Sequence, residues 1–287
     1  MIVHPDQSPT ALPPAAPLTI GILTPDGLID APYTANSLAE AVPYEPDGVY
    51  TITRTFKRDR VLMLGEHLDR LEESARLEGI PLTLDRAALR AALRTLIDRS
   101  GNAESRFRIT VPRQQPDHLY LSVESFTPLA PEVYQQGVRV ITTRIARHNP
   151  TAKTTAWMSE RKAAPLPPGV HEAILVSPEG ELLEGTSSNF YAVIDGALHT
   201  AGEGVLGGIV RRALLQLAPE ILPVVFQPAR IDALWTLEEA FITSASRGVL
   251  PVVIIDGQII GNGRPGVQTM WLREAYEEWA ASHLEPL

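Results

Sequence analysis

The chain has 287 residues, of which 44% are hydrophobic and 21% are charged, and its formal net charge is −9. These values are typical of a globular protein of roughly two domains, and the negative balance argues against a protein that binds nucleic-acid phosphates. Because cysteine is absent, disulfides, thiolate metal sites and a cysteine nucleophile are excluded.

The N-terminal segment predicts neither a membrane anchor nor a secretion signal. No apolar run in the chain approaches the roughly 18 residues of a membrane span, and residues 1–6 lack the basic start and apolar core of a signal peptide. Residues 1–17 are rich in proline, alanine, serine and threonine, which predicts a loose extension. We therefore expect a cytoplasmic protein without a membrane or nucleic-acid partner.

Residues 18–128 predict a small α/β domain. Within 48–56, alternation places Tyr50 and Ile52 on one face of a strand and threonines on the other. Leucines at helical spacing predict an amphipathic helix over 64–75, and Asp85 is expected to cap a second helix. The other strands of this domain are expected over 18–23, 105–111 and 118–122.

Residues 129–287 predict a larger second domain. Prolines at positions 128 and 131 interrupt the chain where we place the boundary. Strands and helices then alternate without the regular βαβ units of a Rossmann sheet, so the predicted fold is α+β. The strands are expected over 138–143, 172–177, 190–194, 222–226, 240–243 and 252–255, and the helices over 208–217 and 267–282.

Lysine is scarce in this chain, which has three lysines among its 25 basic residues. A lysine retained under such a bias suggests chemistry that arginine cannot do, because an amine can lose its proton and condense with an aldehyde whereas a guanidinium cannot. Lys153 is the candidate, although taken alone it would be an ordinary loop lysine. Lys162 is the competing amine, but it stands in a charged cluster typical of a solvated face.

A pyridoxal-phosphate site would use such an amine together with two further groups. It needs a carboxylate for the ring nitrogen and donors for the phosphate. Glu184 is the candidate carboxylate, and Arg70 is a candidate phosphate ligand. Taken alone, Glu184 would be a surface carboxylate, and Arg70 would pair with Glu66 or Glu73 on its own helix.

Five segments together resemble the class IV aminotransferases, which are fold-type IV pyridoxal-phosphate enzymes. That family includes branched-chain aminotransferases, D-amino-acid transaminases and aminodeoxychorismate lyase. The resemblance covers about residues 46–275. Its segments follow one another in the same order as in the family, and at nearly the same spacing. They are His67-Leu68-Asp69-Arg70-Leu71, Lys153, Glu184-Gly185-Thr186-Ser187-Ser188-Asn189-Phe190, Gly207-Gly208-Ile209-Val210-Arg211, and Phe241 to Val252.

The resemblance implies roles for the residues that match the family pattern. Lys153 would form the Schiff base with pyridoxal 5'-phosphate and move the proton, and Glu184 would hold the ring nitrogen. Arg70 would bind the phosphate. The backbone N–H groups that follow Gly208 would also bind it, namely those of Ile209 and Val210.

Two departures from the family pattern affect the remaining assignments. Family members often have a hydroxyl residue where this chain has Ala245, so Ser244 or Ser246 is expected to supply that phosphate contact. The segment 36–43 lacks the Asp-Arg-Gly stretch that many members carry. These differences do not change the cofactor assignment, but they leave the identity of the substrate open.

Four residues are candidates for substrate contacts. Arg106 and Arg108 alternate with apolar residues on one strand, and Arg108 is our candidate for gripping a substrate carboxylate, although a solvated face is an equal alternative. Trp157 would replace an aromatic or aliphatic pocket residue of the family. The other two candidates are Tyr50 and Arg247.

The predicted protein is a homodimeric, two-domain fold-type IV enzyme with the cofactor between a small N-terminal and a larger C-terminal domain. It is expected to move an amino group between an amino acid, with branched-chain acids among the candidates, and a 2-oxo acid. The first alternative is an aminodeoxychorismate lyase that forms 4-aminobenzoate and pyruvate, because residues 246–249 resemble lyase-like members. The second is a non-catalytic, ligand-binding relative. The seven histidines show no metal-ligand spacing, so no metal is expected.

Overall fold

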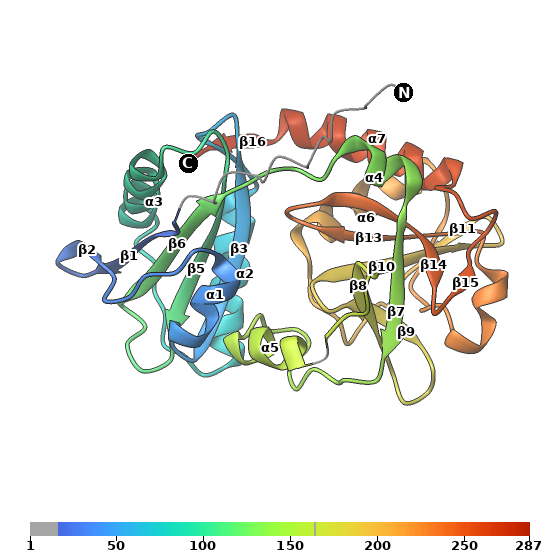
Figure 1. Cartoon of the computed structure of the whole chain (residues 1–287), viewed down its shortest axis with the longest axis horizontal. Coiled ribbons are helices and arrows are strands. Elements are labelled where there is room, and N and C mark those ends of the chain that lie inside the picture. The colour runs from blue at the N-terminus through green and yellow to red at the C-terminus, as the bar shows by residue number, and fades with distance from the viewer. Residues whose placement is uncertain (1–16, 164) are drawn as a thin grey trace, which may run out of the picture.

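The computed structural model describes residues 17–163 and 165–287, and its strands form two separate sheets with helices packed around them (Figure 1). The expected loose extension over residues 1–17 lies, except for Pro17, outside the described residues. No helix of the described residues is both long and apolar enough to cross a lipid bilayer.

The first sheet is built mainly from the N-terminal half of the chain. Its strand order is β16-β4-β3-β5-β6-β1-β2, and every pairing in it is antiparallel. The strands are β1 (Thr19–Thr24), β2 (Gly27–Asp30), β3 (Gly48–Phe56), β4 (Arg60–Leu62), β5 (Ser105–Pro112), β6 (Leu119–Ser125) and β16 (Leu284–Pro286).

Two helices cover this sheet with their leucine-rich faces. Helix α2 (Leu64–Leu77) packs on β3, and α3 (Arg86–Ser100) packs on β1 and β6. The Asp85 carboxylate caps α3 by accepting from two backbone N–H groups in its first turn, as the sequence predicts. Their buried leucines form one core with Phe107 and Ile109 of β5. A short helix, α1 (Leu38–Ala41), and a 3-10 turn, η1 (Val42–Tyr44), precede β3.

The second sheet closes into a barrel. Its strand order is β12-β11-β10-β13-β14-β7-β8-β9, and β9 also pairs with β10, so six strands from β10 to β9 form a ring around an apolar core. Glu184 on β9 stands directly opposite Asn189 on β10 in the pairing that closes it. The strands are β7 (Val138–Thr143), β8 (Glu172–Val176), β9 (Leu182–Gly185), β10 (Ser188–Ile194), β11 (Ala197–His199), β12 (Val224–Val225), β13 (Glu239–Ser244), β14 (Gly248–Ile255) and β15 (Gln258–Ile259).

Helices surround this barrel and connect it to the first sheet. Helix α6 packs against β13, and α7 packs against β14 (Figure 1). Helix α5 instead contacts β3 of the first sheet. The helices are α4 (Pro131–Gln136), α5 (Thr155–Glu160), α6 (Ile209–Leu217) and α7 (Val267–Ser282), with 3-10 turns η2 (Arg161–Ala163), η3 (Ala218–Glu220) and η4 (Ile231–Thr236).

The last residues of the chain return to the first sheet, although the sequence places them in the second domain. Strand β16 pairs with β4, and Leu287 is buried in the core of the first sheet. A further core cluster joins Leu62, next to α2, to Tyr191 of the barrel and Leu272 of α7. The proposed boundary after residue 128 remains a prediction, and the two sheets share both a core cluster and their C-terminal segment.

Most of the predicted strands and helices are confirmed, and the differences lie in short elements. The periodic helices over 64–75 and 267–282 appear as α2 and α7, and every expected strand is present with ends within four residues except 222–226, which is reduced to Val224–Val225. The elements that were not expected are strands β2, β4, β9, β11, β15 and β16 and helices α1, α4 and α5. They are too short to show a periodicity of their own, so their pairing partners stabilise them.

Candidate active site

A cavity of about 420 Å³ lies between the two sheets and brings most of the candidate residues together. This volume falls within the range of about 300–1,000 Å³ that is usual for small-molecule sites. Its lining comes from both halves of the molecule, namely from β3, α2 and β5 on one side and from β9, β10, β13 and the start of α6 on the other. Lys153 and α5 reach it from the loop that follows β7.

Lys153 is held in this cavity by its own backbone. Its carbonyl accepts a hydrogen bond of 2.9 Å from Tyr50 N, and its N–H donates to Ser74 Oγ at 3.1 Å. The loop is thereby docked on β3 and α2, and the side chain lines the cavity with Nζ 4.7 Å from the centre of the Tyr50 ring. Burial, aided by the positive charges of nearby arginines, lowers the pKa of Lys153 to about 8.

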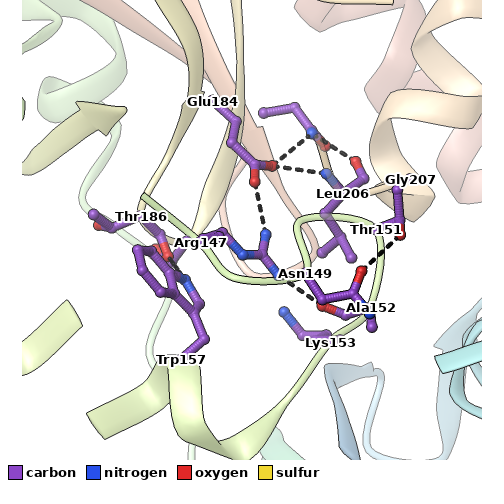
Figure 2. A network of polar contacts seen from close by, with 12 residues as sticks. Arg147, Asn149, Thr151, Ala152, Lys153, Trp157, Glu184, Thr186, Leu206 and Gly207 are labelled. Carbon is purple, nitrogen blue, oxygen red and sulfur yellow. Dashed lines mark hydrogen bonds and ion pairs between the residues drawn. The ribbon is translucent and has the colours of Figure 1, made fainter. Parts of the chain in front are cut away.

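Glu184 lies at the same cavity and is fixed by three partners. Oε1 forms a 2.6 Å ion pair with Arg147 Nη1, and the two side chains are only 3% and 6% exposed, respectively. Oε2 accepts from Leu206 N at 3.0 Å and from Asn189 Nδ2 at 3.4 Å. Burial raises the pKa of Glu184, and Arg147 opposes that rise. Figure 2 shows Glu184 above Arg147, with Lys153 on the other side of the guanidinium.

Arg147, which was not predicted from the sequence, connects Lys153 and Glu184. Its Nη2 donates to the carbonyl of Ala152 at 2.8 Å while Nη1 holds Glu184, so one guanidinium ties the loop of Lys153 to β9 (Figure 2). The only signal in the sequence is its position six residues before Lys153. That position does not reveal a partner 37 residues away.

Arg70 lines the other end of the cavity, where α2 faces the start of α6. Its Nη1 donates to the Gly207 carbonyl at 3.4 Å, its Nη2 donates to Thr51 Oγ1 at 3.3 Å, and its buried Nε has no hydrogen-bond partner among the described residues. His67 lies beside it and contacts the same Thr51 hydroxyl at 3.1 Å. Burial and the neighbouring Arg70 lower the pKa of His67 well below its usual value, so this histidine is neutral.

The start of α6 contributes free backbone donors next to Arg70. Gly208 is its N-cap residue, and no side chain caps the helix, so the N–H groups of Ile209 and Val210 have no side-chain acceptor. A Cβ atom on Gly208 would lie 2.1 Å from Asn189 Oδ1. Any other residue at this position would therefore force Asn189 to move. All three residues line the cavity.

The hydroxyl residues of the β13–β14 turn also lie at this end. Ser244 and Ser246 both line the cavity, together with Thr243 and Ala245. The Ser244 hydroxyl already accepts a 2.8 Å hydrogen bond from Arg247 Nε. No hydrogen bond of the Ser246 hydroxyl is found within the described chain, so Ser246 is the less constrained of the two hydroxyls.

Three of the four expected substrate residues line the cavity. Tyr50 lies beside Lys153, and Trp157 donates from Nε1 to the Thr186 carbonyl at 2.9 Å. Arg247 bridges Glu172 and Ser187 at the cavity wall, with distances of 2.9 Å to Glu172 Oε2 and 3.0 Å to Ser187 Oγ. Burial would raise the pKa of Tyr50, but the charges of Lys153 and the nearby arginines outweigh it and lower this pKa to about 8.

Arg108, the fourth expected substrate residue, does not line the cavity. Its guanidinium is committed to a buried ion pair with Glu45, in which the two side chains are 3% and 1% exposed, respectively. Glu45 also accepts from the hydroxyls of Thr110 and Ser122. The neighbouring Arg106 reaches the cavity instead. Sequence alternation identified the correct strand face but not which of its two arginines reaches the cavity.

The residues of the cavity fit pyridoxal 5'-phosphate in number and kind. The cavity has one buried amine with a lowered pKa, one fixed carboxylate, and a guanidinium with an unsatisfied Nε beside the uncapped start of α6. These groups match the aldehyde, the ring nitrogen and the phosphate of that cofactor. In the described part of the chain, no group of three or more acidic or histidine residues is placed to hold a metal ion.

Comparison with known proteins gives one consistent family. The model of the family "Amino-transferase class IV" matches residues 48–255. The chain is 32% identical to the D-alanine aminotransferase of Bacillus licheniformis, over 80% of this chain and 87% of that protein. It is 27% identical to the branched-chain-amino-acid aminotransferase of Pseudomonas aeruginosa, over 78% and 80%.

The fold is also found among solved structures. The crystal structure of the branched-chain amino acid aminotransferase from Thermoproteus uzoniensis with norvaline superposes with a TM-score of 0.74. The match covers 95% of this chain and 99% of that chain at 20% sequence identity. This confirms the predicted fold-type IV architecture.

The environment of Arg108 predicts a large effect of Glu45 on stability. Replacing Glu45 by Gln should lower the free energy of unfolding by about 3–5 kcal/mol, because it leaves a buried guanidinium without its counter-charge. Urea denaturation of the purified variant measures this. Asp98→Asn is the matched control, since the Arg58–Asp98 pair is exposed and should contribute no more than about 1 kcal/mol. Equal effects of the two variants would contradict a structural role for the Glu45–Arg108 pair.

Proposed function

Because the chain belongs to the class IV aminotransferase family, we propose that it transfers an amino group between an amino acid and a 2-oxo acid, with Lys153 as the residue that bonds covalently to pyridoxal 5'-phosphate. The observation that carries this proposal is the convergence of Lys153, Glu184 and Arg70 on one cavity from three separate parts of the chain.

The cofactor, when bound, supplies an aldehyde that takes up amino groups and a protonated ring that accepts electrons from the substrate's α-carbon. The chain supplies the proton transfers. Lys153 Nζ, buried and with a pKa of about 8, is the base that removes the α-proton once the substrate amine has displaced it. Proton transfer by one positioned group contributes typically about 10²–10⁴-fold to the rate.

Glu184 is proposed to keep the proton on the ring nitrogen. Arg147, Leu206 and Asn189 fix both carboxylate oxygens, so the group is oriented before any ligand arrives. Arg70 and the N–H groups of Ile209 and Val210 are proposed to hold the phosphate, with Ser246 as a further donor.

The covalent role of Lys153 can be tested directly. Hydride reduction of the protein with pyridoxal 5'-phosphate, followed by digestion and mass spectrometry, should place the cofactor mass on the peptide that contains Lys153. Lys162→Ala is the matched control and should be labelled like the parent, because Lys162 Nζ is exposed and donates to the Ala39 carbonyl. Label on any other residue, or no label, would refute the assignment.

The reaction type has its own test. With a panel of amino acids that includes L-branched-chain acids and D-alanine, the purified protein should convert 2-oxoglutarate to glutamate, and Lys153→Ala should not. The panel follows from the relatives, whose names include both branched-chain-amino-acid and D-alanine aminotransferases. Pyruvate release from aminodeoxychorismate without an acceptor acid would instead support the lyase.

The lowered pKa of Lys153 predicts the pH dependence of cofactor capture. Only the neutral amine attacks an aldehyde, so the rate should rise about tenfold per pH unit below the pKa and level off above it. Stopped-flow absorbance should therefore give a midpoint near the lowered value of about 8 rather than 10.5. Tyr50→Phe should move this midpoint to lower pH, because the Tyr50 charge favours the protonated amine.

The matched control for that shift is Tyr44→Phe, which changes an exposed tyrosine away from the cavity and should leave the midpoint unchanged. A midpoint near 10.5 in the parent protein would mean that Lys153 is not held in a buried, positively charged environment.

A further inference from the structure

The cavity holds more positive than negative side chains. Five guanidiniums and the Lys153 amine line it, whereas Glu184 is its single carboxylate among the described residues. The five arginines are Arg70, Arg106, Arg147, Arg161 and Arg247. Charges buried in proteins need counter-charges, so the positive groups that lack one indicate where anions bind.

Three of these arginines already have a carboxylate partner. Arg147 pairs with Glu184 at 2.6 Å, Arg247 pairs with Glu172 at 2.9 Å, and Arg106 Nε donates to Glu124 Oε1 at 2.6 Å. No carboxylate within residues 17–163 and 165–287 lies within ion-pair distance of the other two. They are Arg70 and Arg161.

Two guanidiniums without counter-charges in one cavity call for two anions. The phosphate of the cofactor accounts for Arg70. Every amino acid and 2-oxo acid brings a second anion, its carboxylate, and Arg161 is the cation left for it. We propose that Arg161 is the residue that binds the substrate carboxylate, an inference that rests on the proposed aminotransferase function.

The position of Arg161 suits this role. It begins η2, four residues after Trp157, so both side chains leave the same face of the turn and reach the Thr186 carbonyl. Arg161 Nη1 donates to that carbonyl at 3.3 Å. This single hydrogen bond anchors the guanidinium at the cavity wall and leaves most of its five donors free for a ligand.

The charge of Arg161 also acts at the reactive centre. It is among the charges that lower the pKa of Lys153 and of Tyr50. An anion bound by Arg161 therefore lies within electrostatic range of the amine that is to receive the α-proton. Arg108 cannot serve in its place, because Glu45 already neutralises it outside the cavity.

Substitution of Arg161 by Gln tests the proposal, because an amide can still donate to Thr186 while the charge is lost. A charge-assisted hydrogen bond contributes enough that KM for the amino acid should rise about 10- to 100-fold, with a much smaller change in kcat. Arg161→Lys, which keeps the charge, should restore part of the loss. Arg144→Gln is the matched control, since Arg144 is an exposed arginine outside the cavity lining.

A binding measurement that needs no turnover completes the test. Butyrate and glutarate are titrated into the cofactor-loaded protein, and binding is followed by the change in cofactor absorbance. Equal weakening of both acids in Arg161→Gln assigns Arg161 to the α-carboxylate, whereas weakening of glutarate alone would assign it to a second, distal carboxylate and overturn the proposal. Unchanged affinity for both acids would overturn it as well.

Cofactor uptake separates this inference from the function on which it rests. Arg161→Gln should take up pyridoxal 5'-phosphate and be trapped at Lys153 like the parent protein. Loss of uptake in this variant alone would place Arg161 in the phosphate site and overturn the proposal. Absence of trapping in the parent protein would instead refute the aminotransferase mechanism itself.

Discussion

The buried ion pair between Arg147 and Glu184 determines where the reactive groups of this protein lie. Glu184 belongs to β9, at the seam that closes the barrel, whereas Lys153 belongs to a loop docked on the first sheet. Arg147 joins the two by holding the carboxylate with one nitrogen and the Ala152 carbonyl with another. Because both side chains are almost fully buried, the loss of either one would leave an uncompensated charge, which makes the pair costly to break.

Each buried carboxylate near the cavity forms an ion pair with one guanidinium. These pairs determine which positive charges in the site remain without a counter-charge. Glu45 neutralises Arg108 and Glu172 neutralises Arg247, so neither arginine adds its full charge to the cavity. The remaining positive groups disfavour a further proton, which is one cause of the lowered pKa of Lys153. The same positive charges attract anionic ligands. They therefore both lower the pKa of the Lys153 amine and favour the binding of the anions that react with it.

Local patterns in the sequence predicted the long elements, and the family pattern singled out Lys153, Glu184 and Arg70, but neither revealed the contacts between distant segments. The leucine spacing of α2 and the cap at Asp85 are local signals, and a family pattern singles out Lys153 and Glu184. The position of Arg161 depends on where α5 ends relative to Thr186, which lies 25 residues further along the chain. Helix α5 has only six residues, too few to show a periodicity, so its packing on β3 stabilises it rather than its own sequence.

The return of the chain to the first sheet limits how the molecule can move. The backbone passes from one sheet to the other at residues 126–137, reaches the first sheet again where the Lys153 loop and α5 dock on β3, and returns to it between α7 and β16, where β16 is hydrogen-bonded to β4. Because these crossings lie at different places along the chain, a rotation about any one of them would have to bend the others. Relative motion of the two sheets therefore requires concerted bending of these connections.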